Sequence, residues 1–138
     1  MTENEISKII INSAYKVYFG IGPGLLESIY EKLLSYELQK AGLKVERQVE
    51  IPIIYDGKQF GSELRADLVV EGKVIIELKS VEELKPVFYK QLQTYLRLKN
   101  LHLGLLINFN TSVLKDNIHR VVNHLAENRV NELHGKVN

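Results

Sequence analysis

Cysteine is absent from this sequence of 138 residues, which excludes disulfide bonds and thiolate metal sites. Long apolar runs are also lacking: none approaches the ~20 residues that a membrane helix needs, and the N-terminus has no signal-peptide pattern. Neither sign of charge dominates, because the formal net charge is only +1. No field of the whole molecule would therefore attract nucleic acid or membranes, and any anion binding must be local. We expect a cytoplasmic protein that does not contact membranes.

The remaining composition is that of an ordinary globular protein, with a hydrophobic fraction of 45% and a charged fraction of 25%. The length predicts one domain over residues 1–138. A chain of this size buries roughly 68% of the surface that its unfolded form exposes, which is enough for a substantial core. The residues from Arg129 onward are polar, and we expect this tail to be frayed.

The chain is organised around residues 65–80, which read R-A-D-L-V-V-E-G-K-V-I-I-E-L-K-S. Two β-rich runs flank a turn signal at residues 71–73, a pattern that predicts a β-hairpin. The even positions on either side of the turn are all apolar, whereas the odd positions include Asp67, Glu77 and Lys79. Because successive strand side chains point to opposite faces, we expect one core face and one face with two carboxylates and an ammonium.

This shared face depends on the parity of the hairpin loop. A three-residue loop over residues 70–72, a type I turn closed by its glycine in the left-handed region, keeps the even positions together. It would place Arg65 opposite Glu77 and Asp67 opposite Ile75, so that the two carboxylates are diagonal neighbours. A two-residue loop would send the carboxylates to opposite faces and leave no site.

Two helices are expected before the hairpin. A capping box at Thr2 and Glu5 begins the first, which ends at a Gly-rich turn over residues 20–24. That turn lacks the Lys-Ser/Thr of a phosphate loop and follows no strand, so we interpret it as a helix-to-helix connection. The second helix covers about residues 25–40 and has Gly42 as its stop. Its apolar stripe consists of Leu26, Ile29, Leu33 and Tyr36, and another side carries Glu27, Tyr30, Glu31 and Leu34.

The strands form a meander that leads into a crossover. A strand over residues 43–55, interrupted at Pro52, turns into a second strand that runs from Gln59 to the hairpin. Pro86 begins a helix that extends to about residue 100. The nearly all-apolar run over residues 103–109 is typical of a strand buried on both faces, and a right-handed crossover would pair it parallel to the Glu77 strand.

A last helix is expected over about residues 112–128, with apolar residues at helical spacing. The complete order is therefore α, α, β, β, β, α, β, α. It predicts the α/β fold class: an α/β sandwich with a mixed central sheet of four or more strands flanked by helices.

The polar face of the hairpin has the chemistry of phosphodiester hydrolysis. Asp67 and Glu77 supply acceptor-only oxygens, which suit Mg²⁺ or Mn²⁺, and the backbone carbonyl of Leu78 is a further ligand. Lys79 lies roughly 6.6–7 Å along the strand from Glu77, where it can orient water or neutralise charge on a scissile phosphate. The alternative is a cross-strand salt bridge that includes Arg65, worth about 0–1 kcal/mol if exposed.

Three segments together resemble a known family. They are G-L-L-E-S-I-Y at residues 24–30, D-(9 residues)-E-L-K at residues 67–79, and Q-L-Q-T-Y at residues 91–95. Their order and spacing resemble the PD-(D/E)XK nuclease superfamily, and the first matches the pattern that names its small GxxExxY family. The resemblance covers about residues 6–123. It implies a restriction-endonuclease-like fold and hydrolysis assisted by Mg²⁺ or Mn²⁺.

The resemblance also implies roles for individual residues. Glu27, Asp67 and Glu77 would be metal ligands, and Lys79 would be the catalytic lysine. Four further residues would support the site or the substrate: Gln91, Tyr95, Tyr30 and Glu31. The Gln91–Tyr95 pair, one helical turn apart, is similar to a Q-x-x-x-Y element of recombination-type exonucleases. Its alternative interpretation is a buried hydrogen-bonded pair.

These observations predict a metal-dependent nuclease that acts on DNA in preference to RNA. A homodimer would supply two sites for the two strands of a duplex. One alternative is a non-catalytic nucleic-acid-binding or assembly module on the same fold, since folds can persist without the chemistry. Another is a hydrolase of small nucleotides or other phosphorylated substrates.

Overall fold

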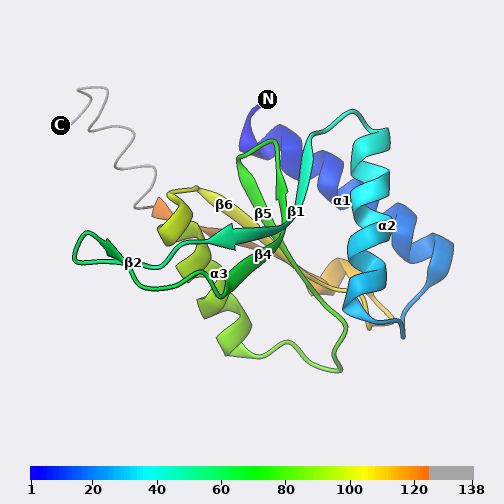
Figure 1. Cartoon of the computed structure of the whole chain (residues 1–138). Coiled ribbons are helices and arrows are strands. Elements are labelled where there is room, and N and C mark those ends of the chain that lie inside the picture. Colours follow the sequence, from blue (N-terminus) through cyan, green and yellow to red (C-terminus); the bar gives the residue numbers. More distant parts are fainter. Residues whose placement is uncertain (125–138) are drawn as a thin grey trace.

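The structure, a computed structural model, describes residues 1–124 and contains a mixed sheet between helical layers (Figure 1). Its helices are α1 (Glu3–Ile21), α2 (Glu27–Lys40) and α3 (Pro86–Lys99), with a short 3-10 helix η1 (Leu114–Asn117). Its strands are β1 (Val45–Ile51), β2 (Ile54–Tyr55), β3 (Lys58–Gln59), β4 (Leu64–Val70), β5 (Val74–Lys79), β6 (Leu103–Asn108) and β7 (Ile118–Val122). The five-stranded sheet has the order β1-β4-β5-β6-β7, and β2 and β3 pair separately.

The expected α/β architecture is confirmed. Strand β5 pairs parallel to β6, as the crossover through α3 requires, and the other neighbours are antiparallel. Helices α1 and α2 cover one face of the sheet, and α3 covers the other (Figure 1). The sheet is therefore buried on both faces, which explains why all six residues of β6 are buried.

Local signals in the sequence explain where the helices begin. The Thr2 hydroxyl accepts the Glu5 backbone N–H at 3.2 Å and the Glu5 carboxylate accepts the Thr2 N–H at 3.2 Å, which completes the capping box. These bonds hold the pKa of Glu5 below its usual value. Helix α3 has Pro86 at its start and ends at Asn100, which adopts the left-handed conformation.

Along both β1 and β4, the positions that face a given helical layer switch from one parity to the other. On β4, Leu68 packs in the core under α1 and α2, whereas Ala66 packs in the core under α3. On β1, Val45 and Val49 are divided in the same way. The prediction of one even-numbered core face is therefore correct from Leu68 onward and wrong for Ala66. Between these positions Gln48 has φ +50°, a left-handed conformation at the point of the switch.

The hairpin between β4 and β5 differs from its predicted register by two residues. Leu68 pairs with Ile76 and Val70 with Val74, so the loop covers residues 71–73 instead of 70–72. Both residues 71 and 72 have positive φ. The loop still has three residues, which keeps the parity, but Asp67 now stands next to Glu77 instead of opposite Ile75.

Helix α2 buries a different face from its apolar stripe. Leu26 is 73% exposed and Tyr36 is 59% exposed, whereas Tyr30, Glu31 and Leu34 are buried. The reason is that the polar atoms of Tyr30 and Glu31 have hydrogen-bond partners, which removes most of the cost of burying them.

The predicted C-terminal helix is wrong over its described part. Residues 114–117 form η1, and residues 118–122 form β7, which pairs antiparallel with β6. The apolar spacing fits a helix, but the β-branched residues there fit a strand equally well, and pairing satisfies the otherwise open edge of β6. Residues 125–138, which include the rest of this helix and the tail from Arg129, lie outside the described residues.

The predicted strand over residues 43–55 is interrupted at Pro52, as expected. Beyond the interruption, β2 and β3 form a small hairpin that leaves the main sheet (Figure 1). We refer to residues 52–61 as the arm. No described helix is long and apolar enough to cross a membrane.

Candidate active site

The two central carboxylates lie where the ladder between β4 and β5 stops. Backbone pairing ends at Leu68 and Ile76. Beyond that point the Asp67 N–H donates to Oε2 of Glu77 at 2.7 Å, and the Leu78 N–H donates to Oδ2 of Asp67 at 2.8 Å. Each side chain therefore takes the place of a lost ladder partner. The predicted meeting of these carboxylates is observed, although in the shifted register.

Burial and nearby negative charge raise the pKa of both carboxylates. Glu77 is 5% exposed, and its burial, together with the charge of Asp67, raises its pKa to about 8. Burial is also the largest cause that raises the pKa of Asp67, assisted by the charge of Glu31 and opposed by the hydrogen bond from Leu78. Buried like charges of this kind are a recognised feature of functional sites.

Lys79 ends β5 next to these carboxylates. Its positive charge lowers the pKa of both Asp67 and Glu77, against the larger effect of burial. Its Nζ lies 4.5 Å from the ring centroid of Phe88 on α3, in a cation–π contact. Within residues 1–124 no ion pair joins Lys79 or Arg65 to the two carboxylates, so the salt-bridge alternative is not observed there.

A hydrogen-bonded loop positions the start of α2. The Tyr30 hydroxyl donates to the Gly22 carbonyl at 2.6 Å and accepts the Leu25 N–H at 3.2 Å. Gly24 has φ +93°, a conformation that favours glycine. These contacts give the G-x-x-E-x-x-Y spacing a physical meaning, because the glycine and the tyrosine fix the loop that precedes Glu27.

The same loop is tied to the end of the central strand. The Ser80 hydroxyl donates to the Leu25 carbonyl, which holds the beginning of α2 against the residue that follows Lys79. The Tyr30 ring also stacks on Phe109 after β6, with centroids 4.4 Å apart. Tyr30 is therefore a buried structural support for the loop.

The carboxylates of two layers open into one pocket of about 340 Å³. Its lining residues are Glu27, Ser28, Glu31, Gln48 and Asp67. The charge of Glu27 also raises the pKa of Glu77. The structure therefore brings the predicted helical glutamate to the same place as the hairpin carboxylates.

Two neighbours of Glu31 were not predicted from the sequence. Arg47 donates to Oε2 of Glu31 at 2.9 Å, and the Gln48 amide donates to Oε1 of Glu31 and to Oδ1 of Asp67, the latter at 3.4 Å. Gln48 thus connects α2 to β4 through its side chain. Its unusual backbone conformation has no signature in the sequence, which explains why the sequence did not indicate it.

The predicted pair on α3 is hydrogen-bonded, with Gln91 Nε2 3.0 Å from the Tyr95 hydroxyl. Tyr95 is buried, and burial is the largest cause that raises its pKa, followed by the charges of Glu77 and Asp67. The charges of the two carboxylates therefore act on Tyr95, although it lies on α3. Gln91 is exposed at the surface, so the pair is not buried throughout.

The carboxylates do not form a finished metal centre. Among the described residues, no three His, Cys, Asp or Glu side chains stand together in a metal-binding group. The donor set nevertheless suits a hard cation, because carboxylate oxygens are its preferred ligands. Asp67 and Glu77 each accept a backbone N–H through one carboxylate oxygen only, which leaves acceptor sites for a metal ion.

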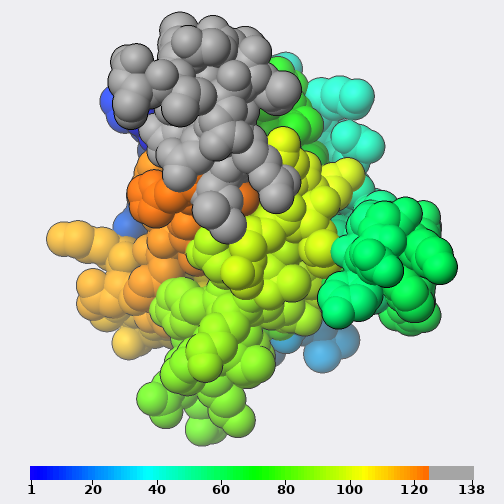
Figure 2. Space-filling model, turned by 90° about the vertical axis from the view of Figure 1, so that its left-hand side faces the viewer, coloured from blue at the N-terminus to red at the C-terminus, as the bar shows by residue number. Residues whose placement is uncertain are grey.

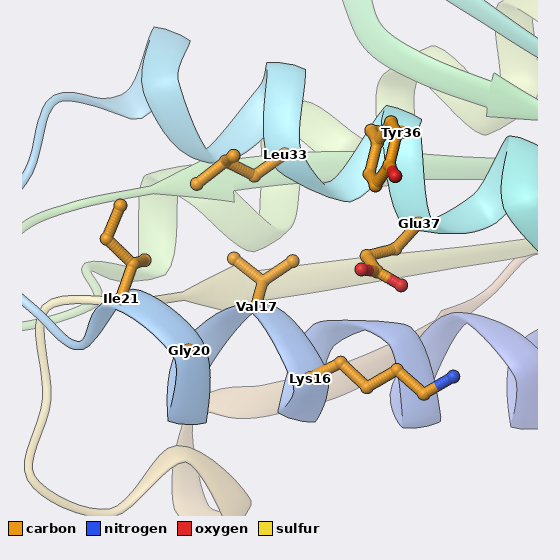
Figure 3. Close-up of a pocket in the computed structure, with 7 residues that line it drawn as sticks. All are labelled: Lys16, Val17, Gly20, Ile21, Leu33, Tyr36 and Glu37. Carbon is orange, nitrogen blue, oxygen red and sulfur yellow. The ribbon is translucent and has the colours of Figure 1, made fainter.

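A second pocket, of about 280 Å³, lies between α1 and α2 (Figure 3). Its lining residues are Lys16, Val17, Gly20, Ile21, Leu33, Tyr36 and Glu37. It shares none of these residues with the carboxylate pocket, and most of them are apolar. None of them is a predicted site residue.

Comparison with known families identifies the superfamily of the chain. A family model described as the PD-(D/E)XK nuclease superfamily matches residues 4–121. The chain therefore belongs to the PD-(D/E)XK nuclease superfamily, and its fold is restriction-endonuclease-like. Members of this superfamily are usually nucleases and generally use divalent metal ions. No curated protein and no solved structure matches the chain.

The finer assignments stay predictions. They are the GxxExxY family, the identity of the metal ion, the role of each site residue, and the backbone carbonyl of Leu78 as a ligand. The geometry above determines which of these residues are neighbours, and the proposals below assign their roles.

Proposed function

We propose that this protein is a nuclease that hydrolyses phosphodiester bonds in DNA, with RNA as a less favoured substrate, and that it uses Mg²⁺ or Mn²⁺. One observation carries the proposal. Asp67 and Glu77 are locked to each other at the end of the β4–β5 ladder, beside Lys79 and next to the pocket of Glu27. A buried carboxyl group this close to a second carboxylate and an ammonium is costly without a task.

The carboxylates would hold the cation. Asp67, Glu77 and Glu27 are the proposed ligands, with the Leu78 carbonyl as a further oxygen. When bound, the divalent ion would lower the pKa of a coordinated water and stabilise charge on the phosphate. Glu31 would remain paired with Arg47 and Gln48, which keeps its carboxylate at the pocket wall.

Lys79 would act on the phosphate or on the attacking water. Its aliphatic stem emerges from a strand whose backbone is fixed, because its carbonyl accepts the Phe109 N–H at 3.0 Å. The Phe88 ring would hold the ammonium near the carboxylates. Gln91 and Tyr95 would support this side of the site from α3.

Further parts of the proposal concern the context of the reaction. A homodimer would present two sites to the two strands of a duplex, and the location would be cytoplasmic. The small net charge supports recognition through local contacts instead of a field of the whole molecule.

The decisive experiment compares Lys79→Ala with wild-type protein on labelled DNA in the presence of Mn²⁺. We expect cleavage by the wild type and a loss of at least about 100-fold in the variant, because a positioned electrostatic group contributes on this scale. The matched control is Lys32→Ala, which removes an exposed lysine from α2 and should leave cleavage unchanged. Melting temperatures should be similar in all three proteins.

Two results would contradict the proposal. If wild-type protein cuts neither DNA nor RNA with Mn²⁺ or Mg²⁺, the nuclease assignment fails. If, in addition, Mn²⁺ leaves the melting temperature unchanged, the non-catalytic binding or assembly module becomes the better interpretation. Cleavage of small phosphorylated substrates without competition by DNA would favour the small-molecule hydrolase instead.

A further inference from the structure

The arm is a well-defined hairpin outside the main sheet. Ile54 pairs with Gln59 and Tyr55 with Lys58 around a two-residue turn. The turn residues Asp56 and Gly57 both have positive φ, as tight hairpin turns of the primed type require. Below them the Phe60 N–H donates to the carbonyl of residue 53 at 2.8 Å, and the ladder continues to Gly61. The arm can therefore present its side chains in a fixed arrangement.

The arm exposes large apolar side chains that nothing in the described chain covers. Tyr55 is 74% exposed, Phe60 is 63% exposed and Ile54 is 51% exposed. The rings of Tyr55 and Phe60 meet edge to face, with centroids 6.2 Å apart. Figure 1 shows the arm projecting away from the sheet and its helices, and Figure 2 shows it standing out on the right of the molecule. An exposed aromatic pair at the tip of a projection indicates a contact surface.

The strands that carry the arm also carry the pocket. Beyond the last pair of the main ladder, Ile51 and Leu64, β1 and β4 continue directly into the arm. In the other direction the same two strands lead to Gln48 and Asp67, which line the carboxylate pocket. At ~3.3 Å per residue, the seven residues from Asp67 to Phe60 span at most about 23 Å. This corresponds to roughly seven stacked nucleotides at ~3.4 Å each.

The charges around the arm favour contact with bases over contact with phosphates. Asp56 and Lys58 balance each other at the tip, and the base of the arm carries Glu50, Glu63 and Arg65. A duplex presents its phosphates to the outside, so it would meet no net positive charge here. An aromatic ring can instead stack on any base whose face is accessible, which is the case in unpaired strands.

We propose that the arm binds unpaired nucleobases by stacking on Tyr55 and Phe60, and that the substrate is therefore single-stranded or locally unpaired nucleic acid. This inference rests on the proposed function, because it assigns the arm to the same substrate as the carboxylate pocket. The arm holds the strand beyond the pocket, and the ends of β1 and β4 lie on the path between the two. Specificity for a base sequence is not expected, because every base has a face on which a ring can stack.

The sequence contains no tryptophan, which permits a direct test. Tyr55→Trp places a single indole at the tip, and Lys79→Ala in the same chain prevents cleavage during the measurement. We expect the fluorescence to be quenched by a 20-nucleotide oligo-dT, with at least about tenfold weaker binding of a blunt 20-base-pair duplex. Adding Phe60→Ser should weaken oligo-dT binding by at least about fivefold, the smallest effect typical of one stacked base.

The matched control is Tyr36→Trp in the same Lys79→Ala chain. Tyr36 is also an exposed tyrosine, at 59%, but it lies on α2 beside the second pocket. Its indole should not respond to oligo-dT. Because the arm residues are exposed, all variants should keep the melting temperature of the parent. Equal quenching at both positions, or equal affinity for oligo-dT and duplex, would overturn the inference.

The outcomes separate this inference from the proposed function. If the wild type cuts no nucleic acid but Tyr55→Trp is quenched by oligo-dT, the proposed function fails and the arm remains a nucleobase-binding surface. If the wild type cuts single strands and Tyr55→Ser with Phe60→Ser cuts them equally well, the nuclease stands and the inference fails. The molecular mass in solution could instead rise with protein concentration only when both rings are present, while oligo-dT binding does not depend on them. That result would identify the arm as a self-association surface and reject the inference.

Discussion

At Glu77, burial and the nearby Asp67 charge raise the pKa to about 8, from the ordinary 4.5 of a glutamate. Between about pH 4.5 and pH 8, the folded protein therefore keeps a proton on Glu77 that the unfolded chain has released. Because the native state binds more protons there, the free energy of unfolding decreases as the pH increases. The raised pKa of Asp67 acts in the same direction. The metal-free site thus lowers the free energy of unfolding progressively as the pH rises to about 8.

We predict that metal-free wild-type protein melts at a lower temperature at pH 8.5 than at pH 5.5, by about 5 °C. Glu77→Gln should reduce this difference, because an amide can accept the Asp67 N–H but carries no charge at either pH. The measurement is thermal unfolding in a chelating buffer, followed by circular dichroism. Because the two proteins differ only in this side chain, the comparison isolates the carboxyl. Equal pH dependence in the two proteins would contradict a raised pKa at Glu77.

At the scale of elements, the parts predicted correctly from the sequence are those fixed by short-range chemistry. The capping box of α1 and the Pro86 start of α3 involve neighbours in the chain, and the apolar run of β6 leaves no exposed face. The hairpin and its parallel neighbour follow from the same patterns. Those elements were sufficient to bring Asp67, Glu77 and Lys79 together, so most of the candidate site was predictable.

The sequence-based predictions that were wrong concern features that depend on contacts between distant segments. The inward face of α2 includes Glu31 because Arg47 and Gln48, on another element, satisfy its carboxylate. The observed hairpin register differs from the predicted one by two residues, because the turn with positive φ values falls at residues 71 and 72. The described part of the predicted last helix forms strand β7 instead, because β6 offers a free edge with which it can pair. Hydrophobic spacing within one segment contains none of this information.

The packing of α3 on β6 depends on Gly104, and this gives a prediction for the whole element. A Cβ at this position would lie 2.8 Å from Cδ1 of Leu92, which is completely buried. We predict that Gly104→Ala lowers the free energy of unfolding by about 1–3 kcal/mol, because a tightly packed core resists added volume. Cleavage should also fall, since α3 carries Phe88 and Tyr95. Urea unfolding gives the first quantity.

Gly20→Ala is the matched control for this substitution. Gly20 lies in α1, and a Cβ there would meet nothing within 4 Å. In a helix, alanine is favoured over glycine by up to about 1 kcal/mol, so this variant should be slightly more stable than the wild type. The packing argument for α3 fails if Gly104→Ala is as stable as Gly20→Ala.

At the scale of the whole molecule, the candidate site lies where residues of the helical layers and of the sheet come together. Glu27 and Glu31 come from α2, Asp67 and Glu77 from the sheet, and Tyr95 from α3. A cation bound by Glu27, Asp67 and Glu77 would link α2 to the sheet, and it would bind only the folded chain because these ligands are far apart in the sequence. Metal binding should therefore stabilise the entire fold by mass action.

We predict that 1 mM Mn²⁺ raises the melting temperature of the wild type and that the increase is larger at pH 8.5 than at pH 5.5. At the lower pH the cation must displace the proton on Glu77, whose pKa is about 8, whereas at the higher pH that carboxylate is free. Saturation at 100 times the dissociation constant corresponds to about 2.7 kcal/mol. The control is Asp67→Asn with Glu77→Gln, which keeps the size of both side chains. If Mn²⁺ raises its melting temperature as much as that of the wild type, the ion binds elsewhere and these carboxylates are not its ligands.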